Sequence, residues 1–383
     1  MRKICVVINS RANYARIKSV LVELRDSKDC ELQIVAGASA LLFKYGNVVE
    51  IIKKDGFKVN KQVYTAVEGN EPIVMAKTTG LALLELSQVF YDLKPDIVLT
   101  IADRHETIAT AIAASYMNIP VAHTQGGEIT GSVDELVRHA CTKLSHIHFP
   151  ATKKSEKNIL QMGEEAQRVF MVGCPALDII ETAANLTLEK VLIKHHLNPT
   201  MFKSQNFLVV LYHPDTQYFL QAKTETIKIL SAMKELDLPV LWLWPNIDSG
   251  TDFISKELRT FKENNLNSKI KFVRNFTAED YIVILNNSLC IVGNSSSGIR
   301  ESSRTGTPSI SLGSRQLGRE YAENVIFMKD FEVKTLLDSM RIQINHGKFT
   351  SSNLYGDGRA GKRIAEVLLQ VDLVLQKKFV ELD

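Results

Sequence analysis

The sequence has no long uninterrupted apolar run, since none of its segments reaches the roughly 18 consecutive apolar residues that a membrane-spanning helix needs. Neither sign of charge dominates, because 46 Lys and Arg face 43 Asp and Glu and leave a net charge of +3. This balance argues against nucleic acid as the main partner. The amino end carries only five apolar residues after its charges, at positions 4–8. That is too few for a secretory signal, so we expect a first strand there and a cytoplasmic protein without a membrane partner.

Cysteine is also scarce. The five cysteines are odd in number and never spaced as Cys-x-x-Cys, which argues against a disulfide framework or a structural zinc site. Cys5 and Cys290 lie in apolar runs, and we expect them to pack as small hydrophobic residues. The histidines lack metal-binding spacing, so we predict no metal site. No Gly-x-Gly-x-x-Gly follows the first apolar run, and no Gly-x-x-x-x-Gly-Lys-Ser/Thr occurs, which disfavours dinucleotide cofactors and P-loop chemistry.

What the chain does contain is short β-branched runs that alternate with longer amphipathic stretches, such as the helical pattern at residues 107–117. At 383 residues it is long enough for two domains of roughly 150 residues or more each. Alternating strand and helix implies parallel sheets with right-handed crossovers. We therefore predict an α/β fold of two Rossmann-like, doubly wound domains, 1–180 and 181–383, which face each other across a cleft. The predicted strands are residues 4–8, 32–36, 96–102, 120–123, 146–149 and 168–172, then 206–212, 238–244, 270–273, 289–293, 309–312 and 324–328.

The last amphipathic segment, residues 361–379, is rich in Leu and Val and is expected to form a helix. Its pattern fits packing on either domain, including a return to the first.

Polar side chains gather where the predicted strands end. Asp103 follows strand 96–102, and Glu128 and Asp134 follow strand 120–123. Ligands of open parallel sheets bind beyond the carboxyl ends of the strands, so we interpret these carboxylates as an acid/base set. The alternatives are structural: Asp103 caps the next helix, and Asp134 pairs with Arg138 at i,i+4.

A second group of small polar residues, Gly-Asn-Ser-Ser-Ser-Gly at 293–298, follows strand 289–293. Small residues let the backbone approach a ligand, hydroxyls donate, and a following helix start is partly positive, which together suit a pyrophosphate. An ordinary strand–helix turn with a Ser cap is the alternative. Glu301 either accepts ribose hydroxyls or suits the helix dipole, and Arg315 either pairs with phosphate or is a surface residue. Phe276 either stacks on a base or is an apolar staple before a helix that starts at Thr277.

Nine short motifs occur in one order along the chain. They are Arg11-Ala-Asn-Tyr, Asp103-Arg104, Gly126-Gly-Glu128, Asp134 with Arg138-His139-Ala, His213-Pro214, Pro245-Asn246-Ile-Asp248, Gly293-Asn-Ser-Ser, Arg300-Glu301 and Leu312-Gly-Ser-Arg-Gln316. In this order the motifs closely resemble the hydrolysing UDP-N-acetylglucosamine 2-epimerases of sialic acid biosynthesis. The resemblance runs from the first strand to about Arg363.

The resemblance implies the glycosyltransferase B-type fold and conversion of UDP-N-acetylglucosamine (UDP-GlcNAc) plus water to UDP and N-acetylmannosamine. It implies no metal or redox cofactor, and a homodimer or homotetramer. Asp103, Glu128 and Asp134 would act on the sugar, and His213 would lie by the diphosphate. The residues expected to surround UDP are Arg11, Arg104, Asn246, Phe276, Ser295, Ser296, Ser297, Gly298, Glu301 and Arg315.

Some positions depart from the family pattern, including Asn9-Ser10 for the usual Gly-Thr, Ala102 for Gly and Gln125 for a frequent Glu. These departures bear on the sugar more than on the reaction. A related group acts on UDP-diacetylbacillosamine in the legionaminic acid pathway. Its usual glycine-loop insertion is absent between Glu128 and Asp134, which favours UDP-GlcNAc. The same cleft would also suit three other functions: a UDP-sugar glycosyltransferase, a non-hydrolysing epimerase or a nucleotide-sugar sensor.

The chemistry of the sugar constrains the mechanism. Its C2 hydrogen is not acidic, so an ordinary carboxylate cannot remove it directly. If the C1–O bond breaks first, positive charge at C1 makes that hydrogen labile, and its loss gives a glycal. Proton return on the opposite face of C2, with water added at C1, requires at least two acid/base groups.

Overall fold

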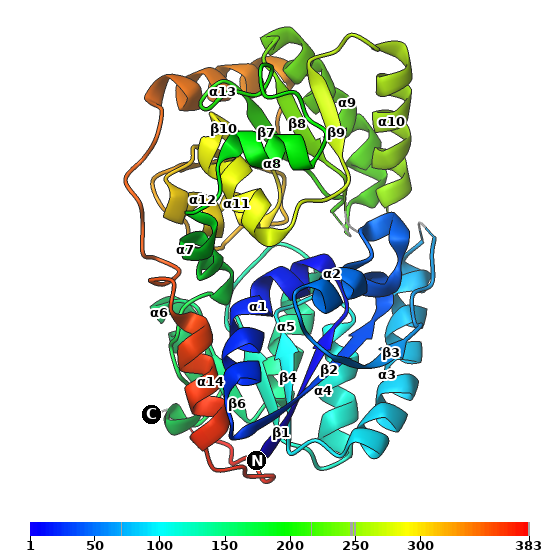
Figure 1. Cartoon of the computed structure of the whole chain (residues 1–383), viewed down its shortest axis with the longest axis vertical. Helices are drawn as coiled ribbons and strands as arrows, with labels where there is room; N and C mark the ends of the chain where they lie inside the picture. Colours follow the sequence, from blue (N-terminus) through cyan, green and yellow to red (C-terminus); the bar gives the residue numbers. More distant parts are fainter. Residues whose placement is uncertain (70, 216, 246–247, 249, 382–383) are drawn as a thin grey trace.

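Parallel strands form one six-stranded sheet in each half of the chain (Figure 1). The computed structural model describes residues 1–69, 71–215, 217–245, 248 and 250–381. The first sheet has the order β3-β2-β1-β4-β5-β6 and the second β12-β11-β10-β7-β8-β9. The strands are β1 (Arg2–Ile8), β2 (Cys30–Gly37), β3 (Val59–Val63), β4 (Ile97–Ile101), β5 (Val121–Thr124), β6 (Ile147–Phe149), β7 (Leu208–Leu211), β8 (Val240–Leu243), β9 (Ile270–Val273), β10 (Cys290–Gly293), β11 (Ser309–Leu312) and β12 (Val325–Met328).

Both sheets have the same winding. Each starts at a central strand, β1 or β7, adds two strands on one side, and then crosses to the other side at β4 or β10. The direction of winding therefore reverses between β1 and β4 and again between β7 and β10. Ligands of doubly wound sheets bind at the carboxyl ends of the strands at this reversal, because the connecting loops part there. The two predicted doubly wound domains are confirmed as two such sheets.

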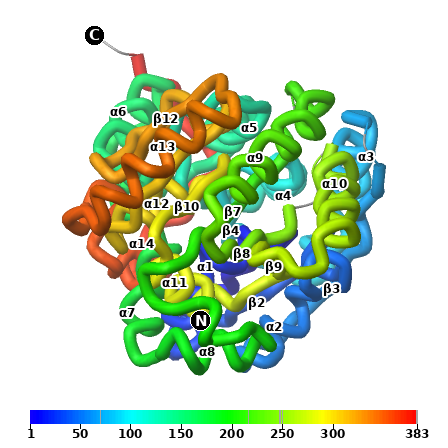
Figure 2. Tube along the Cα trace, turned by 90° about the horizontal axis from the view of Figure 1, so that it is seen from above, coloured from blue at the N-terminus to red at the C-terminus, as the bar shows by residue number. Residues whose placement is uncertain are grey.

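Helices cover both faces of each sheet, and apolar side chains fill the layers between them. Seen from above, α9, α10 and α13 lie on one face of the second sheet, with α7, α8 and α11 on the other (Figure 2). The helices are α1 (Arg11–Asp26), α2 (Val48–Lys54), α3 (Pro72–Leu93), α4 (Thr107–Tyr116), α5 (Val133–Leu144), α6 (Lys153–Gln161), α7 (Ile179–Ala183), α8 (Leu188–Lys194), α9 (Ala222–Leu236), α10 (Thr251–Asn264), α11 (Ala278–Asn287), α12 (Arg300–Thr305), α13 (Val333–His346) and α14 (Ala360–Gln370).

The sequence prediction fails at the edges of the first sheet. Strand β3 was not predicted, because Val59–Val63 is polar in its middle and only partly buried at its edge position. The strand predicted at residues 168–172 is wrong. Only Val169 there makes a single bridge, to His148, after a short 3₁₀ turn. The neighbouring strand β6 is only three residues long, so it offers little backbone for a further strand to pair with.

The carboxyl-terminal helix α14 lies beside α1 of the first half (Figure 1). Ile364 and Leu368 are fully buried in the core cluster that also contains Ile17 and Leu21. The guanidinium of Arg2 donates to the carbonyl oxygens of Leu368 at 2.6 Å and Val371 at 2.9 Å. The last helix thus packs back on the first sheet, while the domain boundary between residues 180 and 181 stays our prediction.

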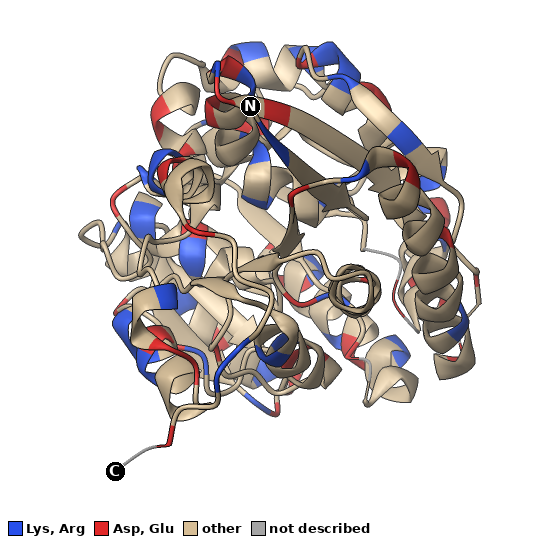
Figure 3. Ribbon diagram, turned by 90° about the horizontal axis from the view of Figure 1, so that it is seen from below, with Lys and Arg blue, Asp and Glu red and all other residues tan. Residues whose placement is uncertain are grey.

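The surface carries charges of both signs, interspersed over the helices in the view from below (Figure 3). Among the described residues, α3 is long and apolar enough, with a mean hydropathy of 1.3, to span a membrane by length and composition. One stripe of this helix, including Leu86, Val89 and Phe90, is buried in a core cluster shared with α4. Such a stripe is also what a core-facing helix of an α/β domain shows.

Packing of α14 predicts that Leu368→Ala lowers the free energy of unfolding by about 2–5 kcal/mol, because a fully buried leucine leaves a cavity when truncated. Urea denaturation followed by far-ultraviolet circular dichroism measures the change. Both tryptophans, Trp242 and Trp244, lie in the second half, so their fluorescence reports separately whether that half follows. The control is Glu366→Ala on the exposed side of α14, expected within about 0.5 kcal/mol of the parent protein. Equal urea midpoints of unfolding for Leu368→Ala and Glu366→Ala would contradict the packing of α14 on the first half.

Candidate functional site

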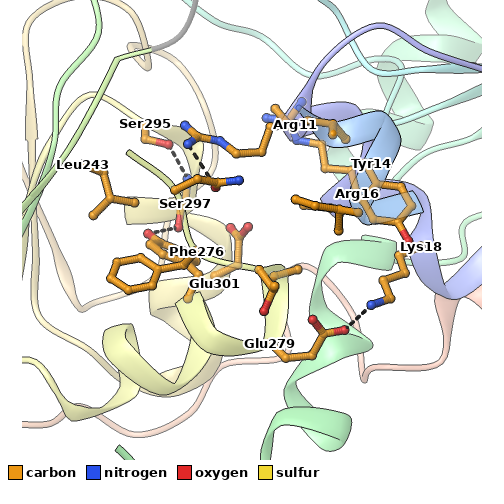
Figure 4. A pocket seen from close by; sticks show the side chains of 18 of the residues that line it. Arg11, Tyr14, Arg16, Lys18, Leu243, Phe276, Glu279, Ser295, Ser297 and Glu301 are labelled. Carbon is orange, nitrogen blue, oxygen red and sulfur yellow. Dashed lines mark hydrogen bonds and ion pairs between the residues drawn. The ribbon is translucent and has the colours of Figure 1, made fainter. Parts of the chain in front are cut away.

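A cavity of about 130 Å³ lies between the two halves, at the carboxyl ends of the central strands (Figure 4). Side chains of α1 and α2 form one wall, and the ends of β7 and β8 with the segments that follow β7, β9 and β10 form the other. The residues labelled in Figure 4 are Arg11, Tyr14, Arg16 and Lys18 of α1 and Leu243, Phe276, Glu279, Ser295, Ser297 and Glu301 of the second half. The predicted cleft is therefore present where both sheets reverse their winding.

The serine-rich loop that follows β10 is tied closely to the end of β7. Gly293 has a φ of +145°, and a Cβ there would lie 2.1 Å from the Leu211 carbonyl oxygen, so only glycine fits. The Asn294 side chain then accepts from the His213 N–H at 2.8 Å and donates to the His213 carbonyl at 2.7 Å. The side chain of Asn294 thus holds together the loops that follow β7 and β10, both of which line the cavity.

Each serine of this loop has a definite partner. Ser295 caps a short 3₁₀ turn by accepting from the Ser297 N–H at 3.3 Å, so the capping alternative describes Ser295 correctly. Arg16 of the first half donates to the Ser296 hydroxyl at 2.7 Å, and the Ser297 hydroxyl shares a 2.5 Å hydrogen bond with Tyr281. Ser295, Ser296 and Ser297 all line the cavity. Gly298 lies one residue beyond the lining, where a Cβ would approach the Ser309 hydroxyl to 2.9 Å.

Glu301 and Phe276 line the same cavity. The Glu301 Oε2 is buried and has no hydrogen-bond partner among the described residues, so it remains able to accept from a ligand hydroxyl. Phe276 is buried and meets the His195 ring edge-on at 4.6 Å. Directly after it, Thr277 caps α11 by accepting from the Asp280 N–H, as predicted. Phe276 thus both packs before the helix and presents an aromatic surface to the cavity.

Arg11 and His213 complete the cavity on its polar side. Arg11 donates to the Arg274 carbonyl at 2.8 Å and to the Asn275 side chain at 3.1 Å, which links the start of α1 to the second half. Burial lowers the pKa of His213 well below its usual range, and the cations Arg315 and Arg11 lower it further. The imidazole is therefore neutral near pH 7.

Arginine side chains surround the carboxylate of Asp103. Arg138 of α5 donates to it from Nη2 at 2.5 Å and from Nε at 3.2 Å, and Arg16 approaches to 3.5 Å. Burial opposes ionisation of Asp103, yet the charges of Arg138 and Arg16 hold its pKa well below the usual value. Asp103 is thus a permanent anion at neutral pH.

Glu128 crosses to the second half. It accepts from Arg300 Nη2 at 2.6 Å and 2.5 Å and also pairs with Arg319, all three side chains being nearly fully buried. Gln125 accepts from the other terminal nitrogen of Arg300 at 2.7 Å. Removal of one partner of a buried ion pair typically costs about 3–5 kcal/mol, so these contacts hold the halves in register.

Asp134 is the least tightly paired of the three carboxylates. It lies in the first turn of α5, 3.5 Å from Arg315 of the second half, and one-fifth of its side chain is exposed. Burial raises the pKa of Asp134; Arg315 lowers it, and the negative charge of Asp103 raises it again. Asp134 is consequently the carboxyl group best able to exchange a proton near neutral pH.

Arg104 and Arg315 meet at Asp248 of the second half. Arg104 Nη1 lies 3.1 Å from Asp248 Oδ1, and Arg315 Nη2 lies 3.7 Å from Asp248 Oδ2. Arg315 is largely buried, so its interpretation as a surface residue is wrong. Its Nη1 is buried and has no hydrogen-bond partner in the described part of the chain, which leaves a donor for an anion. Asn246 lies outside the described residues.

Two structural alternatives from the sequence are wrong. The helix α4 has Glu106, not Asp103, at its N-cap position, and Asp103 instead pairs with arginines. Asp134 pairs with Arg315 rather than with Arg138, which points to Asp103. Sequence reasoning gave no role to Arg16, Arg300 and Arg319, and it paired Arg138 with Asp134 instead of Asp103. Arg138 and Arg300 do stand within the nine motifs, which was the available signal.

Comparison with known proteins agrees with this geometry. The family model described as UDP-N-acetylglucosamine 2-epimerase matches residues 22–369. The chain is 34% identical to the UDP-N,N'-diacetylbacillosamine 2-epimerase (hydrolyzing) of Legionella pneumophila over 97% of both chains. It is 28% identical to the UDP-N-acetylglucosamine 2-epimerase of Neisseria meningitidis over the full length of both.

Solved structures share the fold. The UDP-GlcNAc 2-epimerase of Methanocaldococcus jannaschii, in complex with UDP-GlcNAc and UDP, has a TM-score of 0.80 at 19% identity and covers 96% of this chain and 99% of its own. The Neisseria meningitidis enzyme bound to UDP-GlcNAc has a TM-score of 0.77 at 19% identity, over 96% and 100%. The arrangement is the glycosyltransferase B-type fold predicted from the sequence. With a family match that spans most of its length, the chain belongs to the UDP-N-acetylglucosamine 2-epimerase family.

Proposed function

We propose that this protein is a hydrolysing 2-epimerase, which converts a UDP-linked 2-acetamido sugar and water to free UDP and the 2-epimeric sugar. The observation that carries the proposal is the pairing of three carboxylates of the first half with arginines of the second half, next to its serine-rich loop. Arg16 joins the two groups directly, since it contacts both Asp103 and Ser296. A single arginine side chain thus bridges an acid/base candidate and the loop that is proposed to bind the diphosphate.

The cavity suits a uridine diphosphate. Phe276 offers a face for the base, and the unpaired Glu301 oxygen offers an acceptor for ribose hydroxyls. Arg11, the serine hydroxyls, neutral His213 and the free Arg315 Nη1 are donors for the two phosphates. Donors aimed at the departing diphosphate favour cleavage of the C1–O bond, because negative charge develops there.

The reaction then proceeds by elimination and hydration. As the C1–O bond breaks, its electron pair leaves with UDP, and a carboxylate removes the C2 proton to give a glycal. Water next adds at C1 while a carboxyl group returns a proton to the opposite face of C2. Asp134, with its raised pKa, is suited to one of these transfers, and Glu128 is our candidate for the other. The fixed negative charge of Asp103 also stabilises positive charge at C1.

Two sugars are candidates. Relatives named for diacetylbacillosamine are 34% and 33% identical to this chain, from Legionella pneumophila and Campylobacter jejuni, which favours UDP-N,N'-diacetylbacillosamine. The short loop between Glu128 and Asp134 favours UDP-GlcNAc and N-acetylmannosamine as its product. We propose the diacetylated sugar first and UDP-GlcNAc second. Assembly as a homodimer or homotetramer and a cytoplasmic location remain predictions from the sequence.

The experiment that tests the proposal is incubation with each UDP-sugar in deuterated water, followed by nuclear magnetic resonance. We expect free UDP and a 2-epimeric sugar that carries deuterium at C2, because the glycal regains its proton from solvent-exchanged carboxyl groups. A product with only protium at C2 argues against elimination. An intact UDP-linked epimer indicates the non-hydrolysing reaction, UDP release only with an acceptor sugar indicates a glycosyltransferase, and no turnover indicates a sensor.

Asp134→Asn is expected to lower kcat by about 10²–10⁴-fold, the usual contribution of a general acid/base, while UDP binds within a few-fold of normal. Steady-state UDP release and calorimetric titration with UDP separate the two effects. The matched control is Glu135→Gln, the adjacent carboxylate on α5, which contacts Thr130 and His139 instead of the second half. A parallel loss in both variants would assign the effect to α5 as a whole and not to Asp134.

The pH profile should show the raised pKa of Asp134. Ionised Asp134 is the base, so kcat/KM falls as pH drops through its pKa, which lies above the ordinary value of about 4. Arg315→Gln removes a cation that favours the ionised form, so this acid limb should move to higher pH. Arg315→Lys keeps the charge and should leave the limb near its original position. Measurement of kcat/KM from pH 4 to 9 checks both, and a limb that moves to lower pH in Arg315→Gln would refute the assignment.

A further inference from the structure

A second, smaller cavity of about 20 Å³ lies at the same edge of the first sheet. Its lining comes from the segments that follow β2, β3 and β4, from the first turns of α3, and from Asp248 of the opposite half. This volume is enough for one group of about the size of a buried water molecule. The cavity is thus large enough for a methyl group but too small for a second sugar.

One wall of this cavity is apolar and made of small or flexible side chains: Ala38, Ala66, Val67, Val74 and Met75. His105 and Glu106 lie on its polar side, where Glu106 accepts from Arg104 at 3.3 Å. The two hydroxyl groups at the cavity are engaged within the fold. Ser39 donates to the Asn9 carbonyl at 3.0 Å, and Thr78 accepts from the Val67 N–H at 3.0 Å. These bonds fasten the loops and leave an interior suited to an apolar group.

One carboxylate oxygen at the cavity accepts no hydrogen bond among the described residues. Asp248 Oδ2 is buried, its side chain is only 4% exposed, and Arg315 Nη2 approaches it no closer than 3.7 Å. Its other oxygen pairs with Arg104 at 3.1 Å, which fixes the carboxylate in place. A carboxylate oxygen accepts from an N–H or O–H, and a buried acceptor without a donor is costly. The cavity therefore combines an apolar wall with one acceptor beside it.

This cavity adjoins the proposed catalytic groups. Arg315, 3.7 Å from Asp248 Oδ2, is also 3.5 Å from Asp134, and Arg104 directly follows Asp103 in the chain. Arg315 therefore links the Asp248 side of this cavity to Asp134, one of the carboxylates proposed to act on the sugar.

We propose that the cavity is a subsite that receives the methyl of an acetamido group on the far side of the sugar ring, with this methyl against Ala66 and the amide at the edge of the cavity, where its N–H donates to Asp248 Oδ2. The inference rests on the proposed function and deepens it, because it selects UDP sugars that carry a second acetamido group over those with a hydroxyl there. A hydroxyl satisfies the carboxylate but leaves the apolar wall unfilled. One methyl-sized group in an apolar pocket typically changes specificity by about 10–200-fold.

The test is Ala66→Leu, which fills the cavity, with Ala76→Leu on the exposed side of α3 as the matched control. The kcat/KM is measured for UDP-N,N'-diacetylbacillosamine and for UDP-GlcNAc. We expect Ala66→Leu to lower kcat/KM for the diacetylated sugar at least tenfold more than for UDP-GlcNAc, and Ala76→Leu to change neither. Ala66→Val, a smaller filling, should give a smaller loss of the same selectivity, and it replaces Ala66→Leu if that variant does not fold.

An equal loss for both sugars, or no loss for either, overturns the subsite. Failure of the proposed function gives a different result, because the parent protein would then release UDP from neither sugar. In that case calorimetric binding of the two UDP-sugars decides the subsite by itself. The subsite is supported if the parent protein binds the diacetylated UDP-sugar more tightly than UDP-GlcNAc and Ala66→Leu abolishes this difference. Equal affinities of the parent protein for the two UDP-sugars refute it.

Discussion

The structure depends on buried ion pairs that join the two halves at the edge where their sheets face each other. Glu128 of the first half meets Arg300 and Arg319 of the second, and Arg104 meets Asp248. Charges of this kind are costly to bury alone and are stable only when their partners are in place. The pairing of Glu128 and of Asp248 therefore requires this arrangement of the halves, whereas Asp103 pairs with Arg138 and Arg16 of its own half.

The same contacts divide the carboxylates into two kinds. Asp103, surrounded by Arg138 and Arg16, stays negative and has little tendency to take a proton. Asp134 has a single arginine at 3.5 Å and burial that favours its neutral form. Acid/base chemistry near pH 7 requires neighbouring carboxyl groups whose pKa values differ because their environments differ. In the proposed reaction, one cluster would thus supply both a fixed charge and a proton carrier.

In the proposed function, nucleotide recognition and sugar chemistry share residues at the boundary between the halves. Arg16 contacts both Asp103 and a hydroxyl of the serine-rich loop. Arg315 lies between Asp134 and Asp248, and its Nη1 has no hydrogen-bond partner within the part of the chain that the structure describes. A diphosphate that attracts Arg315 would also alter the charge that Asp134 experiences. In the proposed reaction, nucleotide binding would therefore change the pKa of Asp134 through the guanidinium of Arg315.

By itself the sequence determined the strand–helix alternation, the central strands of both sheets and the order of the motifs, because buried strands are apolar and loops carry the polar residues. It also placed Asp103, Glu128, Asp134 and the serine-rich loop at strand ends. It missed the polar edge strand β3, and it did not reveal that Arg300 and Arg319 would pair with Glu128, some 170 or more residues away. Only the tertiary structure decided those pairs, since a side chain's partner across a domain interface depends on how the halves pack and leaves no local pattern in the chain.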